Sequence, residues 1–283
     1  MEVFLVDAFS RTPGKGNLAG VMPATDRLNE QAMLQIAAQV GASETAFMQQ
    51  VAPTRWHNRF FTPQTEVNIC GHATVGGFFL LAKLGLAPPD SALVQVTKAG
   101  ELAVRVTDSE SGTLVWMQLD SPEFIAPDFD LRPALVALGV QLSDLQRELP
   151  LLTAQQNRIF LPLRSVDHLL SLTPDFADLA AFSRSHGLRG IVPYTLGGLA
   201  ADAATHLRHF APVAGVDEDP VTGTSNGYLG VILQRAGFFP AGEFSYIGEQ
   251  GQAVGCAGSV HVRLSPSDLW IGGAACLRGQ ISV

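Results

Sequence analysis

The chain has 283 residues, which suits two domains at about 150 residues each. It is 47% hydrophobic and only 16% charged, so it can bury well-packed cores. The net charge of −8, without a block of basic residues, argues against nucleic acid as a partner. No apolar run approaches the roughly 18 residues that a membrane-spanning helix needs, so no membrane association is expected.

The cysteines and the first residues indicate the compartment. Cys70, Cys256 and Cys276 are odd in number and widely spaced, so neither a disulfide framework nor a zinc site is expected. The opening MEVFLVDAF resembles a strand and lacks the basic start and long apolar core of a secretion signal. We therefore expect a cytoplasmic protein.

The first elements in chain order are strands around one helix. Glu2–Phe9 and Leu18–Met22 are predicted strands. A helix is predicted to begin after Asp26 as N-cap and to stop at Gly41. Glu44 therefore lies at a junction between a helix and the next strand.

The segment from Arg59 to Gly85 combines a strand, a polar turn and a helix. Arg59–Thr62 is predicted as strand, and the turn ends in Cys70-Gly71-His72. Gly71–Gly85 is predicted as a helix that is apolar on most sides, and such a helix must be buried on all sides. The other predicted strands are 46–48, 93–98, 102–107, 114–119, 151–163, 191–194, 208–212, 244–247, 259–264 and 269–274, and the other predicted helices are 131–139, 175–186 and 223–237.

An internal repeat links the two halves of the chain. The motif Arg-x-Phe-x-Pro at 59–63 recurs at 208–212, an offset of 149, and the apolar helix 71–85 recurs at 223–237, an offset of 152. The change in offset places three extra residues before the second helix, and Asp219 is assigned to this insertion. The fold class predicted is α+β, with two pseudo-symmetric domains, each a curved β-sheet or barrel around a central apolar helix.

The start of each apolar helix is a candidate anion site. Cys70–Thr74 and Thr222–Asn226 are equivalent in the repeat, and each offers unpaired helix amides, a glycine and hydroxyl groups. With the domains facing each other, the two helix ends are expected to converge on one cleft and hold a carboxylate. The alternative is ordinary helix capping by hydroxyl side chains.

Three side chains near these turns are candidates for proton transfer. Glu44 in apolar surroundings would have a raised pKa and could exchange a proton near neutrality, although a solvated turn glutamate is equally compatible. His72 can donate to a substrate or serve as a structural histidine. Asp219 can orient a substrate or belong to an ordinary acidic turn.

Other chemistries are disfavoured by the pattern. Cys70 could be a proton-carrying thiolate, but its repeat equivalent Thr222 cannot ionise usefully, so packing is the preferred interpretation. His206-x-x-His209 does not predict a metal pair, because residues three apart in a strand point to opposite faces. No nucleotide-binding glycine loop is present, and no metal or cofactor is expected.

A set of short motifs, in order, resembles the PhzF-like (phenazine-biosynthesis) isomerase family, which has the diaminopimelate epimerase-like fold. The matching segments are Asp7-Ala8-Phe9, Gly16-Asn17, Ser43-Glu44-Thr45, Arg59–Pro63 with Glu66, Cys70–Thr74, Glu218–Gly223, Glu249-Gln250-Gly251 and Trp270–Gly273. They span nearly the whole chain.

The resemblance implies a cofactor-independent isomerase that shifts a double bond by proton transfer on a small carboxylate-bearing substrate. It implies Glu44 as principal acid and base, with His72 and Asp219 polarising the substrate. The substrate-binding residues that it implies are Asn17, Gly71, Ala73, Gly223 and Thr224. It also implies domains of 1–119 with about 275–283 and of 120–274, because the C-terminal strand returns to the first domain, and a homodimer.

Two departures from the family pattern and two rival functions accompany this expectation. The family often has Arg-Pro where this chain has Cys256-Ala257, and Thr224 replaces a common serine. The rivals are a two-base epimerase or racemase on the same fold, which needs Cys70, and a protein that binds small carboxylates without catalysis.

Overall fold

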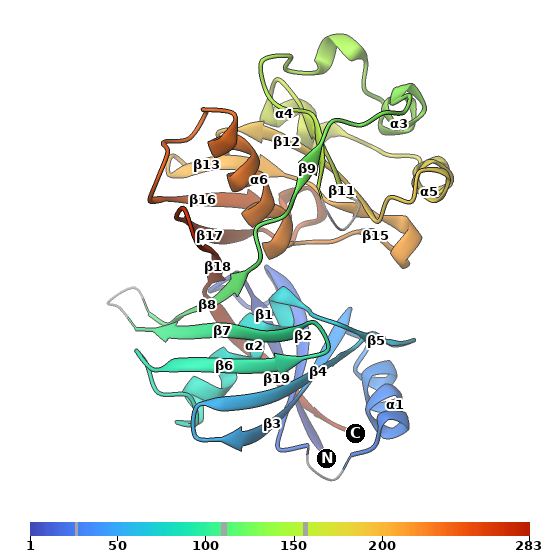
Figure 1. Ribbon diagram of the computed structural model, residues 1–283. Helices are drawn as coiled ribbons and strands as arrows, with labels where there is room; N and C mark the ends of the chain where they lie inside the picture. Colours follow the sequence, from blue (N-terminus) through green and yellow to red (C-terminus); the bar gives the residue numbers. More distant parts are fainter. Residues whose placement is uncertain (26–27, 109–111, 155–157) are drawn as a thin grey trace. The chain divides into compact units, whose positions relative to one another are not determined.

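The computed structural model describes residues 1–25, 28–108, 112–154 and 158–283, which form two compact units (Figure 1). Unit 1 comprises Met1–Leu119 and Trp270–Val283, and unit 2 comprises Asp120–Leu269. The division falls at the first residue of a strand near the C-terminus, Leu269–Gly273.

Unit 1 is built on strands that surround one helix. Its strands are β1 (Glu2–Ala8), β2 (Asn17–Pro23), β3 (Glu44–Ala52), β4 (Arg55–Phe61), β5 (Glu66–Val67), β6 (Ala92–Thr97), β7 (Gly100–Thr107), β8 (Leu114–Leu119), β18 (Leu269–Gly273) and β19 (Ala275–Ser282). Its helices are α1 (Glu30–Val40) and α2 (Gly71–Lys83). The pairing order is β19-β1-β2-β3-β4-β6-β7-β8.

The helix α2 forms the centre of unit 1, as its sequence predicts. Every residue from His72 to Leu81 is buried, and α2 contacts β1, β2, β3, β7, β8 and β19. Close packing depends on small residues, because a Cβ added at Gly77 would lie 2.6 Å from Met48 Sδ. A helix buried on all sides needs a sheet that curves around it, and this sheet does so.

The boundaries of α1 differ from prediction at its start. Asp26, the predicted N-cap, lies outside the described residues, and the Asn29 side chain caps the helix by accepting from Ala32 N. The predicted stop is confirmed, because Gly41 adopts a left-handed conformation with φ of 69°. Glu44 follows as the first residue of β3.

Unit 2 repeats the arrangement. Its strands are β9 (Phe124–Ile125), β10 (Leu152–Ala154), β11 (Arg158–Pro162), β12 (Gly190–Leu196), β13 (Ala203–Leu207), β14 (Phe210–Ala211), β15 (Val216–Glu218), β16 (Phe244–Gln250) and β17 (Gly258–Leu264). Its α-helices are α3 (Arg132–Leu138), α4 (Val166–Ser171), α5 (Phe176–Ser185) and α6 (Gly223–Arg235), and 3-10 turns occupy Leu142–Asp144, Pro212–Ala214 and Gln252–Val254.

The strand pairings confirm the internal duplication. Unit 2 pairs β9-β10-β11-β12-β13-β16-β17. These strands follow the same sequence of parallel and antiparallel contacts as β19-β1-β2-β3-β4-β6-β7 in unit 1. The central helices α2 and α6 also end alike, each in a residue with φ of −84° followed by a glycine of positive φ.

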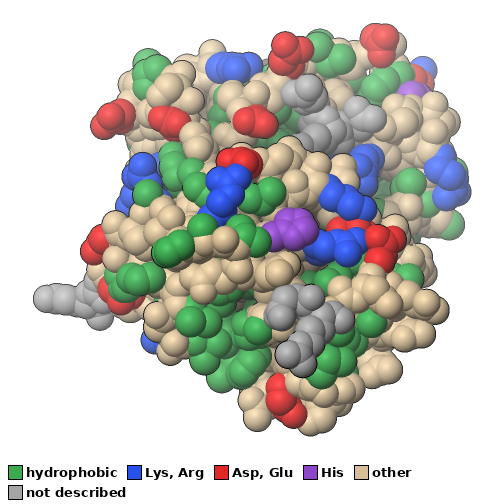
Figure 2. Space-filling model, turned by 60° about the horizontal axis from the view of Figure 1, so that its bottom comes forward, with side chains coloured by type: hydrophobic (Ala, Val, Ile, Leu, Met, Phe, Trp, Pro, Cys, Tyr) green, Lys and Arg blue, Asp and Glu red, His purple; other side chains and the backbone are tan. Residues whose placement is uncertain are grey.

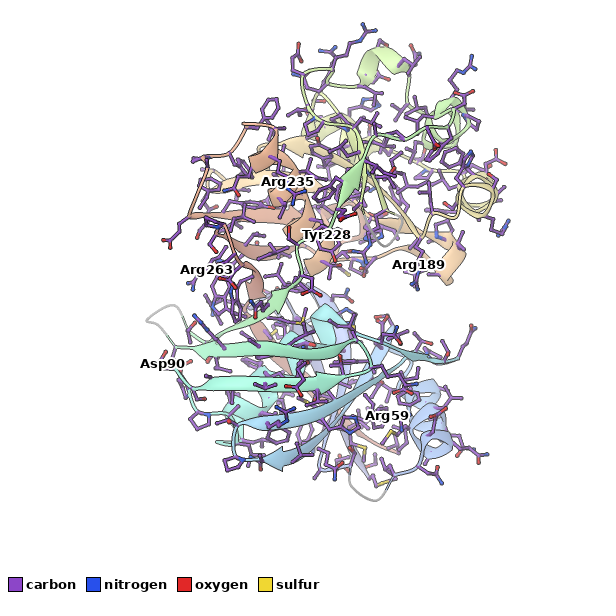
Figure 3. All side chains as sticks on the ribbon, viewed as in Figure 1. Arg59, Asp90, Arg189, Tyr228, Arg235 and Arg263 are labelled. Carbon is purple, nitrogen blue, oxygen red and sulfur yellow. The ribbon has the colours of Figure 1, made fainter. Side chains whose placement is uncertain are left out.

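The repeated arginines make matching contacts. Arg59 lies over the ring of Phe61 at 5.0 Å and pairs with Glu66, whereas Arg208 lies over Phe210 at 4.9 Å and pairs with Glu218. Figure 3 labels Arg59 beside α1, where its guanidinium also reaches Glu30. The arginine–glutamate ion pair thus occupies equivalent positions in the two units.

Two sequence expectations for the segment from Arg208 to Asp219 are wrong. The predicted strand at 208–212 is reduced to β14, because Pro212 has no N–H for the sheet and opens a 3-10 turn instead. The equivalence of Glu66 and Glu218 is already at offset 152, so the three extra residues lie in the turn before β15. Asp219 is therefore equivalent to Val67 and stands outside the insertion.

Candidate active site

In unit 1, Glu44, Cys70 and His72 come together at the start of α2. Glu44 Oε2 lies 3.3 Å from His72 Nε2, and Ser43 Oγ lies 3.3 Å from the same nitrogen. Cys70 Sγ lies 3.5 Å from His72 Nδ1. The imidazole is 8% exposed and the Glu44 side chain 22%, so Glu44 is the more accessible of the two side chains.

The first turn of α2 carries no side-chain cap. Cys70 occupies the N-cap position, but its side chain makes no capping hydrogen bond, and its carbonyl oxygen accepts from Thr74 N and Thr74 Oγ1. No N-cap side chain therefore pairs with the first backbone N–H groups of α2, which form the positive end of the helix dipole. A Cβ added at Gly71 would meet only ordinary contacts, the nearest at 3.6 Å, so packing alone does not demand glycine there.

The Glu44 cluster is also a set of potential metal ligands. The ligand atoms of Glu44, Cys70 and His72 all lie within 4.8 Å of one another. A carboxylate, a thiolate and an imidazole can bind a divalent transition metal. His206 and His209 do not form such a set, since His206 Nδ1 lies 3.2 Å from Glu249 Oε2 whereas His209 contacts the start of α6.

In unit 2, Asp219 is held at the start of α6. Thr222, the N-cap residue, provides no cap to the helix and donates its hydroxyl to Asp219 Oδ2. Gln250 Nε2 donates to Asp219 O at 2.8 Å, and Gln250 Oε1 accepts from Thr222 N at 2.8 Å. Asp219 is thus oriented by the N-cap residue and by the end of β16.

A buried histidine, which the sequence did not single out as a site residue, supports the same turn. His209 Nδ1 lies 3.0 Å from both Thr222 Oγ1 and Ser225 Oγ. A Cβ added at Gly190 would lie 2.3 Å from His209 Nε2, so only glycine leaves room for this imidazole. Burial, and then the nearby Arg158 guanidinium, lowers the pKa of His209 well below its usual value. His209 is therefore a neutral hydrogen-bonding group.

Strand register identifies the unit 2 counterpart of Glu44. Phe61 and Phe210 are equivalent in the repeat, and they pair with Thr45 and Ile191 respectively. The residues one position earlier, Glu44 and Gly190, are therefore equivalent. The carboxylate of unit 1 has no counterpart in unit 2, where the His209 imidazole fills the space.

The other predicted site residues lie at the starts of β2, α2 and α6. Asn17 is buried at the start of β2, and Ala73 is buried in the first turn of α2. Gly223 and Thr224 open α6. Thr224 Oγ1 accepts from Arg158, a residue that sequence reasoning missed because one arginine at the start of an apolar strand carries no motif. Cys256, where the family often has arginine, is half-buried between a 3-10 turn and β17.

Two hollows on unit 1 are lined by Met1, Glu2, Phe4, Met22, Pro23, Ala24 and Leu28, and by Pro23, Ala24, Gln49, Gln50, Trp56 and Leu86. Neither includes a predicted site residue.

Figure 2 shows acidic and basic side chains intermixed on the face it presents. Among the described residues, no helix has the length and apolar character to cross a membrane.

The buried His209 gives the stability of the protein a predictable pH dependence. The pKa of His209 is lowered on folding, so below about pH 6.5 this imidazole binds a proton in the unfolded chain but not in the native protein. As the pH is lowered through this range, the free energy of unfolding should decrease by up to about 1.4 kcal/mol per pH unit. Urea unfolding of the wild type and of His209→Gln, from about pH 7.5 to about pH 5, checks this prediction.

The expected result is a shallower pH slope for His209→Gln. His206, whose pKa burial also lowers, leaves part of the slope in place. The exposed His57 supplies the control, and His57→Gln should retain the full wild-type slope. Equal slopes in His209→Gln and the wild type would contradict the prediction.

Two pseudo-symmetric units, each with a polar turn opening a buried helix, define the diaminopimelate epimerase-like fold. A hydroxyproline epimerase from Agrobacterium vitis, solved with bound trans-4-hydroxy-L-proline, superimposes with a TM-score of 0.60 at 11% identity, over 99% of this chain and 91% of that one. At this identity the likeness concerns the fold alone.

The family profile described as phenazine biosynthesis-like protein matches residues 6–277, and the chain belongs to this family. The uncharacterized isomerase YfhB of Bacillus subtilis is 32% identical over 267 residues, covering 93% of this chain and 90% of the relative. The crystal structure of the PhzF-family phenazine biosynthesis protein of Bacillus anthracis gives a TM-score of 0.93 at 29% identity, over 100% and 98% of the two chains. The chain is an enzyme of the isomerase class.

Proposed function

We propose that this isomerase is cofactor-independent and shifts a double bond in a small carboxylate-bearing substrate by proton transfer through Glu44. The observation that carries the proposal is the Glu44 carboxylate, 3.3 Å from His72 at the uncapped start of α2. A carboxylate beside an imidazole can accept a proton and return it.

The reaction balances without another reactant. Glu44 takes a proton from a carbon next to the substrate's unsaturation, and the C–H electron pair moves into the conjugated system. The protonated Glu44, whose carboxyl proton exchanges with solvent, then delivers a proton to another carbon, which leaves the double bond shifted and the enzyme unchanged. His72 polarises the substrate by hydrogen bonding, a role suited to an imidazole.

The remaining site residues bind and orient in this proposal. The amides around Gly71, Ala73 and Gly223 bind the carboxylate, as unpaired helix amides bind anions. Asp219, oriented by Thr222 and Gln250, polarises the substrate, while Asn17 and Thr224 contact it. The homodimer and the cytoplasmic location expected from the sequence belong to the same proposal.

A two-base epimerase is the second candidate, because Cys70 Sγ contacts His72 beside Glu44. Epimerisation by two bases needs a second proton carrier on the opposite face of the substrate carbon. The register gives Gly190 as the equivalent of Glu44, and the repeat gives Thr222 as the equivalent of Cys70. Neither can carry a proton near neutrality, which favours the one-base isomerase.

Deuterium exchange tests the proposal directly. Small carboxylic acids are first screened for a rise in melting temperature, and those that bind are incubated with the enzyme in deuterium oxide. We expect deuterium in the carbon skeleton of at least one acid, with a shifted double bond seen by NMR. Binding without any exchange would instead indicate a carboxylate-binding protein.

Cys70→Ser separates the isomerase from the epimerase. We expect this variant to retain exchange within about tenfold of the wild type, since in the one-base mechanism the thiol only packs against His72. Measured exchange rates at matched protein stability check this expectation. Loss of exchange in Cys70→Ser, with the fold intact, would favour the two-base mechanism.

A further inference from the structure

Arg158 is a desolvated cation without a carboxylate partner among the described residues. It is the first residue of β11 and is partly buried. The other arginines of the described chain that are not exposed each pair with a carboxylate, namely Arg55 with Glu101, Arg59 with Glu66 and Arg208 with Glu218. Burial of a guanidinium that no carboxylate contacts directly is costly, so this exception points to a ligand.

The contacts of Arg158 place it over the first turn of α6. Arg158 Nη1 donates to Thr224 Oγ1 at 2.7 Å, and the guanidinium carbon lies 5.8 Å from the centre of the Tyr228 ring. Thr224 and Tyr228 are four residues apart and share one face of α6. The cation therefore lies on the helix face that begins at the uncapped amides.

The charges near Arg158 act on its pKa in both directions. Burial lowers the pKa of Arg158, and the neighbouring Arg189 acts in the same direction. The Asp219 charge opposes this effect, but the Asp219 carboxylate is engaged by the Thr222 hydroxyl. A guanidinium has five N–H donors, and in the described residues one hydrogen bond of Arg158 goes to a side chain.

The repeat shows that this cation belongs to one unit alone. Ala19 pairs with Glu44 in unit 1, as Arg158 pairs with Gly190 in unit 2. Equivalent positions thus hold a carboxylate next to alanine in unit 1 and a guanidinium next to glycine in unit 2. The charge is reversed between the two halves, with the proton carrier in one and an anion-binding group in the other.

We propose that Arg158 and Thr224, beside the Tyr228 ring at the start of α6, bind an anionic group of a small dianionic acid. This inference rests on the proposed function and narrows its substrate class to small dianionic acids, either dicarboxylates or phosphorylated carboxylates. A guanidinium binds both kinds of group through paired N–H donors. Arg158 is a specificity-determining residue that takes no part in the proton transfer.

Calorimetric titration of the intact protein with matched probes tests the assignment. The probes are linear dicarboxylates from malonate to adipate, the monoamide of each, and 3-phosphonopropionate. The wild type should bind at least one dianion about tenfold or more tightly than the matching monoamide, the effect of one charged hydrogen-bonding partner. Tighter binding of the phosphonate would support the same site and identify a phosphorylated substrate.

Substitutions assign the preference to Arg158. Arg158→Gln should bind the best dianion and its monoamide within about twofold of each other, and Arg158→Lys should restore part of the difference. Arg235, labelled with Tyr228 in Figure 3, is the last residue of α6 and supplies the control. Arg235→Gln should retain the full wild-type preference.

Two outcomes would overturn the inference, and neither depends on catalysis. One is a wild type without preference for any dianion over its monoamide. The other is a folded Arg158→Gln that keeps the preference. Glu44→Gln, titrated in parallel, should still prefer the dianion, so a failure of the proton-transfer assignment is distinguished from a failure of this one.

Discussion

Replacement of Glu44 by Gln is expected to lower deuterium exchange into a true substrate by about a hundredfold to ten-thousandfold. Gln keeps the size and polarity of Glu but cannot accept a proton at neutral pH. The loss of exchange should be large because strand register makes Gly190 the equivalent residue in unit 2, and a glycine has no side chain that could carry the proton instead. The initial rate of deuterium incorporation in the purified variant is the measurement.

Binding and fold controls make this result interpretable. Glu44→Gln should still raise its melting temperature with the same carboxylic acids as the wild type, because the helix amides that are proposed to bind the carboxylate are untouched. Glu101→Gln, which alters an exposed carboxylate of unit 1, should exchange at the wild-type rate. Exchange retained by Glu44→Gln would refute its role as the proton carrier.

Substitution of Arg208 by Met is expected to lower the free energy of unfolding by about 3–5 kcal/mol, as loss of one partner of a buried ion pair does. The side chains of Arg208 and Glu218 are each 6% exposed. Arg208 Nη1 also donates to Leu169 O at 3.1 Å and to Leu172 O at 2.8 Å. Arg208→Met leaves a buried carboxylate and these carbonyl groups without the guanidinium, and denaturant unfolding measures the cost.

The repeat offers a matched comparison for this prediction. Arg59 is the equivalent arginine in unit 1, but its side chain is 21% exposed and its partner Glu66 also contacts Lys98. Arg59→Met should therefore cost less than Arg208→Met. The double variant Arg208→Met with Glu218→Leu should recover part of the loss, because it leaves no buried charge. Equal costs for Arg59→Met and Arg208→Met would contradict the argument from burial.

The elements that the sequence predicted well are those with strong local patterns. The all-apolar segment after Gly71 could only be a buried helix, and α2 is one. The repeat of Arg-x-Phe-x-Pro and of the apolar helix predicted two similar units, and matching strand pairings confirm them. Prediction failed at 208–212, where a proline and a turn interrupt a strand that looked continuous.

Site contacts depended on information that the sequence pattern does not contain. Glu44 was a candidate from its place between a helix and a strand, but its contact with His72 follows from how β3 lies against the start of α2. Arg158 carried no recognisable motif, and the His206-x-x-His209 spacing did not point to a place at the start of α6. His209 and Arg158 join the start of α6 because Gly190 leaves room for His209 and because β11 begins beside Thr224.

By itself, the sequence determined the α+β class, the duplication, the two polar turns that open the apolar helices and the family to which the chain belongs. These features are encoded in residue order and spacing, which local patterns express. Only the tertiary structure decided that Glu44, Cys70 and His72 adjoin one another, that Gly190 is the counterpart of Glu44, and that Arg158 lies over α6 without a carboxylate partner among the described residues. The physical reason is strand register, which brings together residues distant in the chain. In equivalent strand pairs it places the Glu44 carboxylate in unit 1 and the Arg158 guanidinium in unit 2.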